Sequence, residues 1–299
     1  MLKGLAVNCV RPDLCIYHAN CIDGFGAALA VWLRFGDAVE YLPADYDGAP
    51  PDVTDKHVVV VDFSYPEKVL RAMATSAASI TVIDHHKTAI ENLAEVPEAG
   101  LTWNDHIPIG WGKRFDLDRS GAVLAWDFFH APHPAPSLLL HIQDRDLWKH
   151  HLTGTHEVHA YLASLPYDFV RWEEAAFTLA QPGNQLMEIG AAILRRHKKD
   201  LQDLLALTRR TMRIGGVVVP VANVPYQFAS EAGDIMGRDA PFAATYFDKS
   251  EVRRFSLRSR GPEGADVSKV ARRYGGGGHR SAAGFSVPIG WEGDAEDAA

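Results

Sequence analysis

Four consecutive valines, from Val58 to Val61, restrict most strongly how this chain can fold. β-Branched residues favour strands, and a strand that is apolar at every position suits a sheet covered on both faces. Sheets of that kind are parallel, because the crossover helices that join their strands lie on the two faces. We therefore predict that His57–Val61 is a strand in a parallel α/β sheet.

Two further segments repeat this order of strand, turn and helix. Leu14–His18 is a predicted strand, and a turn containing Gly24 leads into a helix over 25–33. Ser79–Ile83 is another predicted strand. After the valine strand, Pro66 favours a helix start, since the first turn of a helix does not need its N–H. The order predicts three βα units.

Each of these three strands is followed by acidic or histidine side chains. A lone residue of this kind is normally a polar turn or a helix cap. The carboxyl ends of parallel strands meet at one edge of a sheet, where ligands bind, so polar groups at three strand ends converge there. We predict a metal-binding or catalytic edge formed by His18, Asp23, Asp62, Asp84, His85 and His86.

A fourth contribution to this edge is predicted farther along the chain. An apolar helix over 138–143 runs into Asp144–Arg145–Asp146. Two acids directly after a buried helix offer one more carboxylate to the cluster.

The second part of the chain alternates differently. A helical period over 184–210 carries a basic run, Arg195–Lys199, which is more typical of a solvated helix face than of a nucleic-acid site. Segments 217–222, 242–247 and 252–259 are predicted strands of a mixed sheet with helices on one side. The predicted fold class is α/β with two lobes: an N-terminal parallel-sheet domain over 1–178, a helical linker over 179–211, and a smaller C-terminal mixed-sheet domain over 212–299.

A run of four glycines, Gly275–Gly278, interrupts this second lobe. Ordering four glycines is costly, so a flexible linker is one interpretation and a backbone loop that closely approaches a ligand is the other. His279, Arg280 and an apolar strand follow the run, which favours the loop. Backbone N–H groups beside an imidazole and a guanidinium suit a phosphate or carboxylate, and Arg258 on a neighbouring strand offers a second positive charge.

The net charge limits which partners the protein can bind, and the cysteine content indicates its cellular compartment. The formal net charge is −8 and the isoelectric point about 5.9, which argues against a grip on long duplex DNA but allows a nucleotide-sized substrate. Cys9, Cys15 and Cys21 match no zinc pattern and are odd in number, so a disulfide framework is not expected. No apolar run is as long as a membrane span. We expect a cytoplasmic protein with no membrane partner, and a homodimer stays open.

Five ordered motifs resemble those of the DHH-family phosphoesterases that carry a DHH-associated C-terminal domain. The resemblance covers nearly the whole chain. The motifs are the 18–24 segment His-Ala-Asn-Cys-Ile-Asp-Gly, Val61–Ser64, Asp84–His86, Asp144, and Gly276–His279 with Ser281–Phe285.

This resemblance implies a two-lobed enzyme with a manganese-dependent, two-metal site on the N-terminal lobe and a substrate-holding C-terminal lobe, the active site lying in the cleft between them. It implies that Asp62 bridges the two metal ions and that Asp84 orients the neighbouring histidine. His86 would contact the phosphate or assist the leaving group. The implied metal ligands are His18, Asp23, Asp62, His85 and Asp144. The implied contacts to a terminal phosphate or nucleotide are Arg258, Gly276, Gly277, Gly278 and His279, to which the residues themselves add Arg280.

The ligand types indicate which metals the site would bind, and one departure from the family pattern concerns how strongly it would bind them. Carboxylates and imidazoles suit manganese or magnesium, with zinc, iron or cobalt as alternatives, and two ions about 4 Å apart activate water for in-line displacement. Many relatives have two aspartates separated by one residue in the first motif, whereas this chain has Asn20 and Asp23. Either one metal site is weaker, or Asn20 is a neutral ligand.

Three functions remain open from the sequence. The first is hydrolysis of phosphodiesters in short single-stranded oligonucleotides or small nucleotides. The second is hydrolysis of phosphoanhydrides in polyphosphate or pyrophosphate by the same centre, although a row of basic residues for such a substrate is missing. The third is a non-catalytic nucleotide-binding module with a degenerate site, suggested by Asn20.

Overall fold

The computed structural model describes residues 11–45, 48–98, 110–261 and 263–295. These residues form two compact units, Met1–Leu194 and Arg195–Ala299. Cys9 lies outside the described residues.

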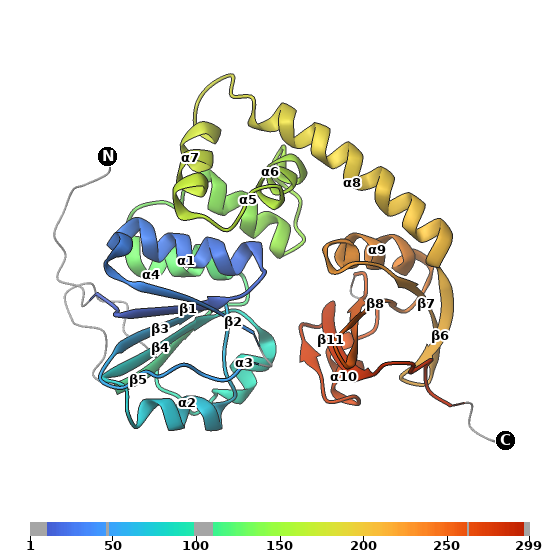
Figure 1. Cartoon of the computed structure of the whole chain (residues 1–299), viewed down its shortest axis with the longest axis horizontal. Coiled ribbons are helices and arrows are strands. Elements are labelled where there is room, and N and C mark those ends of the chain that lie inside the picture. The colour runs from blue at the N-terminus through green and yellow to red at the C-terminus, as the bar shows by residue number, and fades with distance from the viewer. Residues whose placement is uncertain (1–10, 46–47, 99–109, 262, 296–299) are drawn as a thin grey trace. The chain divides into compact units, whose positions relative to one another are not determined.

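The first unit is built on a five-stranded sheet in which every pairing is parallel, as Figure 1 shows. This confirms the predicted α/β class with a parallel N-terminal sheet. The order is β2-β1-β3-β4-β5, so the chain changes direction across the sheet between β1 and β3. The strands are β1 (Leu14–His18), β2 (Glu40–Ala44), β3 (His57–Val61), β4 (Ser79–Asp84) and β5 (Gly110–Phe115).

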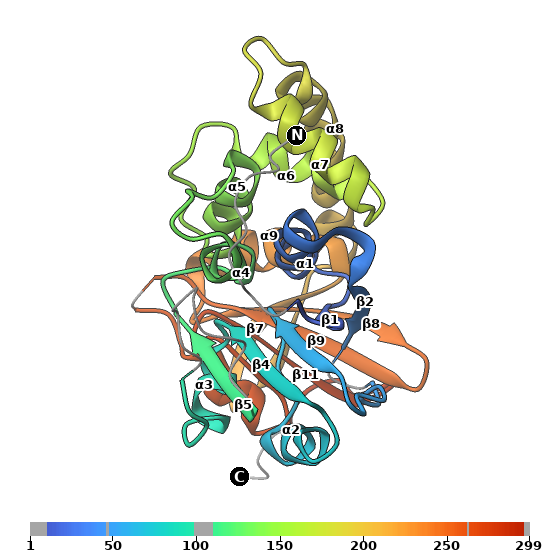
Figure 2. The same cartoon turned by 90° about the vertical axis from the view of Figure 1, so that its left-hand side faces the viewer.

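The four valines of β3 show why this sheet is covered on both faces. Val59 and Val61 pack with α1 and α4, whereas Val58 and Val60 pack on the opposite side with α2. All four are at most 1% exposed, and burying a valine side chain contributes about 1.5–3 kcal/mol. Figures 1 and 2 show these helices on the two faces. The helices are α1 (Ile22–Phe35), α2 (Glu67–Ala74), α3 (Lys87–Asn92), α4 (Gly121–His130), α5 (Ser137–Asp146), α6 (Thr155–Ala163) and α7 (Phe169–Leu179), with a short 3₁₀ turn, η1 (Gly36–Ala38).

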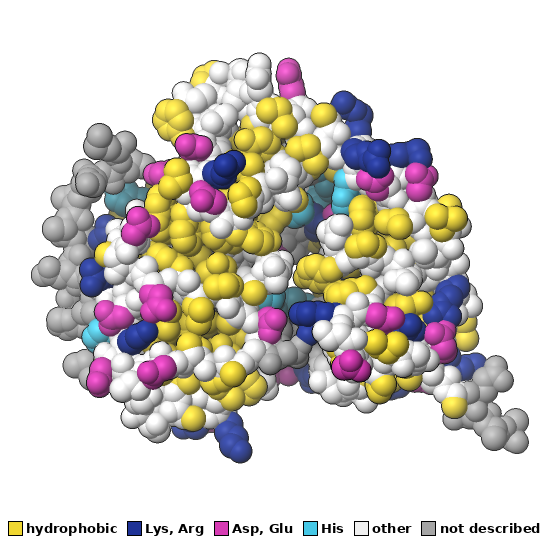
Figure 3. Space-filling model, in the orientation of Figure 1, with side chains coloured by type: hydrophobic (Ala, Val, Ile, Leu, Met, Phe, Trp, Pro, Cys, Tyr) yellow, Lys and Arg dark blue, Asp and Glu magenta, His cyan; other side chains and the backbone are white. Residues whose placement is uncertain are grey.

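The long helix α8 (Leu186–Thr208) follows the predicted helical period. Along its exposed surface, Arg196 pairs with Asp200 at 2.9 Å and Lys199 pairs with Asp203. Figure 3 shows basic and acidic side chains next to one another over part of α8. Ion pairs four residues apart are typical of a solvated helix face.

The second unit contains a six-stranded mixed sheet of order β10-β11-β9-β8-β7-β6. Only the β7–β8 pairing is parallel within the described residues. The strands are β6 (Arg210–Ile214), β7 (Val217–Asn223), β8 (Ala243–Lys249), β9 (Val252–Arg258), β10 (Gly277–Gly278) and β11 (Ala282–Pro288). The helices are α9 (Ala229–Met236) and α10 (Val267–Arg272), with 3₁₀ turns η2 (Tyr226–Phe228) and η3 (Gly237–Asp239).

Helices cover both faces of this second sheet, so the prediction of helices on one side is wrong. Val221 and Ala244 face α10, whereas Ala222 and Ala243, their neighbours in sequence, face α9 and the end of α8. Buried apolar residues at successive positions of β7 and β8 make both faces of the sheet apolar. A sheet with two apolar faces needs cover on each.

Two cysteines fall among the described residues, and both are free. Cys15 is fully buried in β1, and Cys21 is half-buried just before α1. In the part of the chain that the structure describes, every helix is too short or too polar to cross a membrane.

Candidate metal centre

The predicted polar edge of the first sheet brings metal-binding side chains together in three overlapping groups. Within each group, one ligand atom per residue lies within 4.8 Å of the others. The groups are Asp62, Asp84, His85 and His86; His18, Cys21 and Asp62; and Asp23, His85 and Asp146. Asp62 and His85 each belong to two groups, so the three groups form one continuous cluster.

Asp62 lies at the middle of this cluster, directly after β3. Its side chain is 1% exposed, and neither carboxylate oxygen accepts a well-aligned hydrogen bond from the described residues. His85 Nε2 lies 3.0 Å from Oδ1 and His18 Nδ1 lies 3.5 Å from Oδ2. Burial alone would raise the pKa of Asp62, but the two imidazoles hold it well below its usual range. A buried carboxylate that stays charged needs a positive partner, which the protonated imidazoles provide and which a bound metal ion would provide in their place.

The backbone of Asp62 is also unusual. Its φ of 53° is in the left-handed region, which costs a residue with a side chain about 1–3 kcal/mol. Such strain concentrates at functional sites, where the surrounding structure holds it in place. Here it turns the carboxylate toward the ends of β1 and β4.

Asp23 is held by the start of α4. Its Oδ2 accepts a hydrogen bond from the N–H of Gly121 at 2.6 Å, and its Oδ1 accepts one from Ala122 at 3.1 Å. The first N–H groups of a helix have no partner within the helix and favour an anion. Burial, reinforced by the charges of Asp62 and Asp146, nevertheless raises the pKa of Asp23 well above its usual value. A cation is what would restore its charge.

Asp84, at the end of β4, organises the two histidines that follow it. Its Oδ1 accepts hydrogen bonds from the N–H of His85 at 2.7 Å and from the N–H of His86 at 3.2 Å, and it lies 2.7 Å from His86 Nδ1. Because an ionised carboxylate only accepts, we assign the proton of the neutral His86 ring to Nδ1. Nε2 of His86 then has a lone pair for a metal or a proton.

His85 faces three carboxylates. Its Nε2 is 3.0 Å from Asp62, 3.5 Å from Asp23 and 3.6 Å from Asp146. Burial would lower the pKa of His85, but Asp62 and Asp146 raise it well above its usual value. The carboxylates that converge on His85 therefore favour the protonated form of its ring.

Asp146 reaches this cluster among the described residues, whereas Asp144, the predicted ligand, does not. Asp144 instead accepts hydrogen bonds from the N–H of His151 at 2.8 Å, the N–H of Leu152 at 3.1 Å and Thr155 Oγ1 at 2.6 Å. Helix α5 extends through Asp146, and residues two apart on a helix project about 200° apart. The acids thus serve different roles: Asp144 fixes the following loop, and Asp146 faces His85.

The predicted glycine loop lies in the second unit and is part of its sheet. Gly277 and Gly278 form β10 and pair with β11. A Cβ on Gly276 would lie 2.0 Å from the carbonyl oxygen of Gly284, and Gly278 has a φ of 135°. The N–H of His279 donates to the carbonyl of Ala282 at 2.7 Å. These glycines are therefore required by close strand pairing, whatever they bind.

The two predicted arginines of this unit are both held by the protein. Arg280 donates to the carbonyls of Gly261 at 3.2 Å and Gly264 at 3.0 Å. Arg258, at the end of β9, donates to Ser230 Oγ at 2.9 Å and to the carbonyl of Leu257 at 2.9 Å. β11 separates β9 from β10, so Arg258 and the glycine loop lie on strands that are not direct neighbours.

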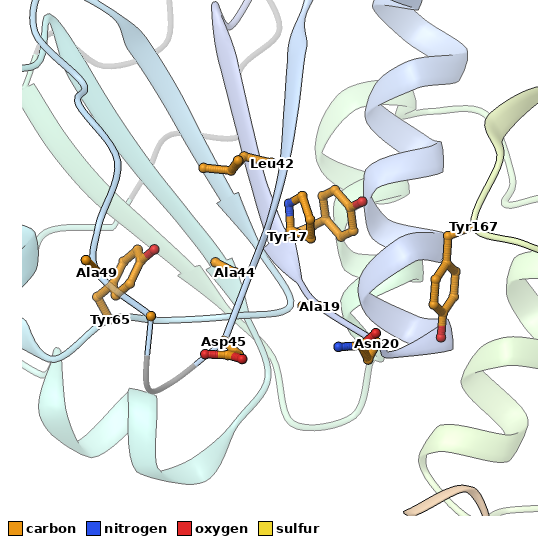
Figure 4. Close-up of a pocket in the computed structure, with 11 residues that line it drawn as sticks. Tyr17, Ala19, Asn20, Leu42, Ala44, Asp45, Ala49, Tyr65 and Tyr167 are labelled. Carbon is orange, nitrogen blue, oxygen red and sulfur yellow. The ribbon is translucent and has the colours of Figure 1, made fainter. Parts of the chain in front are cut away.

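The first unit also contains a pocket of about 500 Å³, and Figure 4 shows residues that line it. Three tyrosines, Tyr17, Tyr65 and Tyr167, line it together with Asn20 and Asp45. Tyr17 and Asn20 lie on either side of His18 in the chain, so the pocket and the cluster meet at the end of β1. The other lining residues are Ala19, Leu42, Pro43, Ala44, Gly48 and Ala49.

The sequence of this chain was compared with family models and with curated proteins. No family model matches the chain. The chain is 30% identical to the uncharacterized protein R106 of Acanthamoeba polyphaga mimivirus over an alignment of 311 residues, which covers 95% of this chain and 69% of that protein.

Two solved structures are similar at lower identity. One is the DHH domain of a protein described as a member of a family of ribosomal proteins, with a TM-score of 0.53, 14% identity, and coverage of 92% of this chain and 82% of that one. The other is RecJ from Thermus thermophilus in complex with Mn²⁺, with a TM-score of 0.47, 14% identity, and coverage of 93% and 50%.

Proposed function

We propose that this chain, which belongs to one family with the mimivirus protein R106 and has the fold of the DHH-family phosphoesterases, is a metal-dependent phosphodiesterase. Its substrates would be short single-stranded oligonucleotides or small nucleotide phosphodiesters. The cofactor would be two divalent ions, with manganese as the first candidate.

One observation carries this proposal: Asp62 is buried, charged and without a well-aligned hydrogen bond among the described residues, at a point where imidazoles and carboxylates converge. Such a group is costly unless a cation meets it. The surrounding side chains offer enough ligands for two ions, because three overlapping groups share Asp62 and His85.

The residues of the cluster would divide the work as follows. Two divalent ions, when bound, supply a water nucleophile and neutralise charge on the leaving oxygen. Asp62 would lie between the two ions, and Asp23, fixed by the start of α4, would keep its carboxylate in place. His86, oriented through Nδ1 by Asp84, would present Nε2 to the scissile phosphate or the leaving oxygen.

The tyrosine-lined pocket supports a nucleotide as substrate. Its volume of about 500 Å³ is within the range of small-ligand sites. Stacking of a base on an aromatic side chain is worth about 1–3 kcal/mol and tolerates any base. A nucleotide whose base lies in this pocket would place its phosphate toward His18 at the end of β1. The net charge of −8 favours small substrates over long ones.

The test is hydrolysis of labelled RNA and DNA of two to five nucleotides by metal-stripped protein, with Mn²⁺, Mg²⁺, Co²⁺ or Zn²⁺ added back. We expect release of mononucleotides only when metal is present. Asp62→Asn should abolish release, because it removes the central charge while keeping the shape of the side chain. Circular dichroism of that variant checks that the fold is retained.

Polyphosphate and pyrophosphate are assayed in parallel. Phosphate release from these substrates alone would replace the proposal with phosphoanhydride hydrolysis. Binding of nucleotides without turnover of any substrate would indicate a non-catalytic module. Tyr17→Ala should raise the KM for an oligonucleotide more than it lowers kcat, since Tyr17 lines the pocket but offers no metal ligand.

A further inference from the structure

The thiol of Cys21 lies in the metal-binding cluster. Cys21 is the residue just before α1, and its Sγ lies within 4.8 Å of ligand atoms of both His18 and Asp62. A thiol at this place was not expected, because the spacing of the cysteines matches no zinc pattern. Three-dimensional proximity, and not spacing, brings it to the cluster.

Cys21 and Asp23 lie on either side of Ile22, where α1 begins. Asn20, one residue before Cys21, has a φ of 53° and lines the tyrosine pocket.

Asp62 provides an independent indication that a ligand belongs between these side chains. Its Oδ2 lies on the side of His18, at 3.5 Å from Nδ1, and its Oδ1 lies on the side of His85, at 3.0 Å from Nε2. Both oxygens are buried and lack a well-aligned hydrogen bond among the described residues. One carboxylate thus faces two separate sets of donors.

We propose that Cys21 is a thiolate ligand of one of the two ions, together with His18 and Asp62. The second ion is held by Asp23, His85 and Asp146, and Asp62 lies between the two. This inference rests on the metal centre of the proposed function. When the first ion binds, the thiol loses its proton to solvent and the sulfur bonds to the metal.

An asymmetric centre follows from this assignment. Thiolate ligands favour zinc, cobalt and iron(II), whereas carboxylate and imidazole ligands also suit manganese. The Cys21 site therefore takes a softer ion than the Asp23 site. Manganese alone would fill the second site better than the first, so full occupancy needs a metal that also binds thiolate well, such as cobalt or zinc.

Cobalt(II) is the probe for this inference, because a thiolate bound to Co²⁺ gives a charge-transfer absorption in the near ultraviolet that oxygen and imidazole ligands do not give. We expect two Co²⁺ ions per chain by calorimetry and this absorption in the wild-type protein. A variant with Cys9→Ser and Cys15→Ala keeps Cys21 as its one thiol and should retain the absorption. Substitution of Cys15, which is fully buried in β1, is the matched control for substitution of Cys21.

Two substitutions of Cys21 complete the test. Cys21→Ser should lose the absorption and bind one of two Zn²⁺ ions at least about tenfold more weakly. Cys21→Asp, which restores the Asp-x-Asp spacing, should lose the absorption but bind two Mn²⁺ ions. Circular dichroism reports whether both variants fold. If neither folds, the presence or absence of the thiolate absorption in the wild-type protein decides whether Cys21 is a ligand.

The outcomes separate this inference from the proposed function. Two bound Co²⁺ ions without a thiolate absorption, or an absorption that survives Cys21→Ser, overturn the role of Cys21 and leave the metal centre standing. Failure of the wild-type protein to bind any of the metals overturns both.

Discussion

Gly121 lies so close to Asp62 that a Cβ added at position 121 would be 2.4 Å from the Asp62 Cβ and 2.6 Å from its Oδ1. The same residue donates its N–H to Asp23. The start of α4 therefore shapes the metal-binding cluster twice: its backbone binds one carboxylate, and its missing side chain leaves room for the other.

Gly121→Ala should reduce activity without unfolding the protein. The methyl group must displace Asp62, which already has a strained backbone, and displacement of about 1 Å is enough to disturb a metal site. We expect kcat for an oligonucleotide to fall at least about tenfold, with weaker binding of metal by calorimetry. Gly237→Ala is the matched control, since a Cβ there makes only ordinary contacts of 3.6 Å or more. Equal effects of the two substitutions would contradict the prediction.

Asp144→Asn should lower the stability of the protein, whereas Asp146→Asn should weaken metal binding, although the two acids are only two residues apart in sequence. Asp144 accepts three hydrogen bonds and is 5% exposed, so its loss should lower the free energy of unfolding by about 2–3 kcal/mol. The Asp146 side chain is 31% exposed, so its substitution should change stability by less than about 0.5 kcal/mol but weaken metal binding. Urea unfolding and metal calorimetry on both variants check this. Metal binding that depends on Asp144 alone would restore Asp144 as the ligand.

The elements that the sequence predicts best are those with a strong local pattern. The valine run of β3 and the apolar run of β4 identify strands buried on both faces, and the polar residues after them identify the edge where ligands bind. The strands that sequence analysis did not identify are the outer ones. β2 contains Pro43, which an edge strand tolerates, and β5 contains glycines and charges, so neither has the composition of a central strand.

The candidate site shows where local patterns stop being sufficient. The convergence of Asp62, Asp84 and His85 follows from parallel topology, and the DHH-type fold is confirmed. The choice between Asp144 and Asp146 depends on where α5 ends, and helix ends are poorly determined by sequence. The place of Cys21 depends on the turn between β1 and α1. The roles of all these side chains in binding metal stay predictions.

Gly276→Ala should destabilise the second unit even if the glycine loop binds phosphate. The added Cβ would lie 2.0 Å from the carbonyl of Gly284, inside the β10–β11 pairing. We expect faster hydrogen exchange of the β11 amides and a loss of about 2 kcal/mol or more in unfolding free energy. Gly275→Ala is the comparison, because Gly275 has a φ of 78° but open space around it, and should cost about 1–2 kcal/mol. A Gly276→Ala protein as stable as wild type, with phosphate binding lost, would instead give the loop a purely ligand-binding role.

His130 should make stability fall in mild acid. Its Nε2 lies 2.7 Å from the carbonyl oxygen of Ala30, and its ring stacks on Trp126 at 3.8 Å. Burial lowers the pKa of His130 to about 4, whereas an unfolded chain has a value of about 6.5. The neutral ring is favoured by the fold, so its contribution is complete above about pH 6.5 and is lost progressively as the pH falls toward 4.

His130→Gln isolates this effect, because glutamine keeps an N–H donor but does not titrate. Between pH 7 and pH 4.5, the wild-type protein should lose about 2–3 kcal/mol of unfolding free energy relative to the variant, measured by urea unfolding at both pH values. Carboxylates that titrate in the same interval affect both proteins alike and cancel in the comparison. Parallel losses in the two proteins would show that the fold does not lower the pKa of His130 and would contradict the prediction.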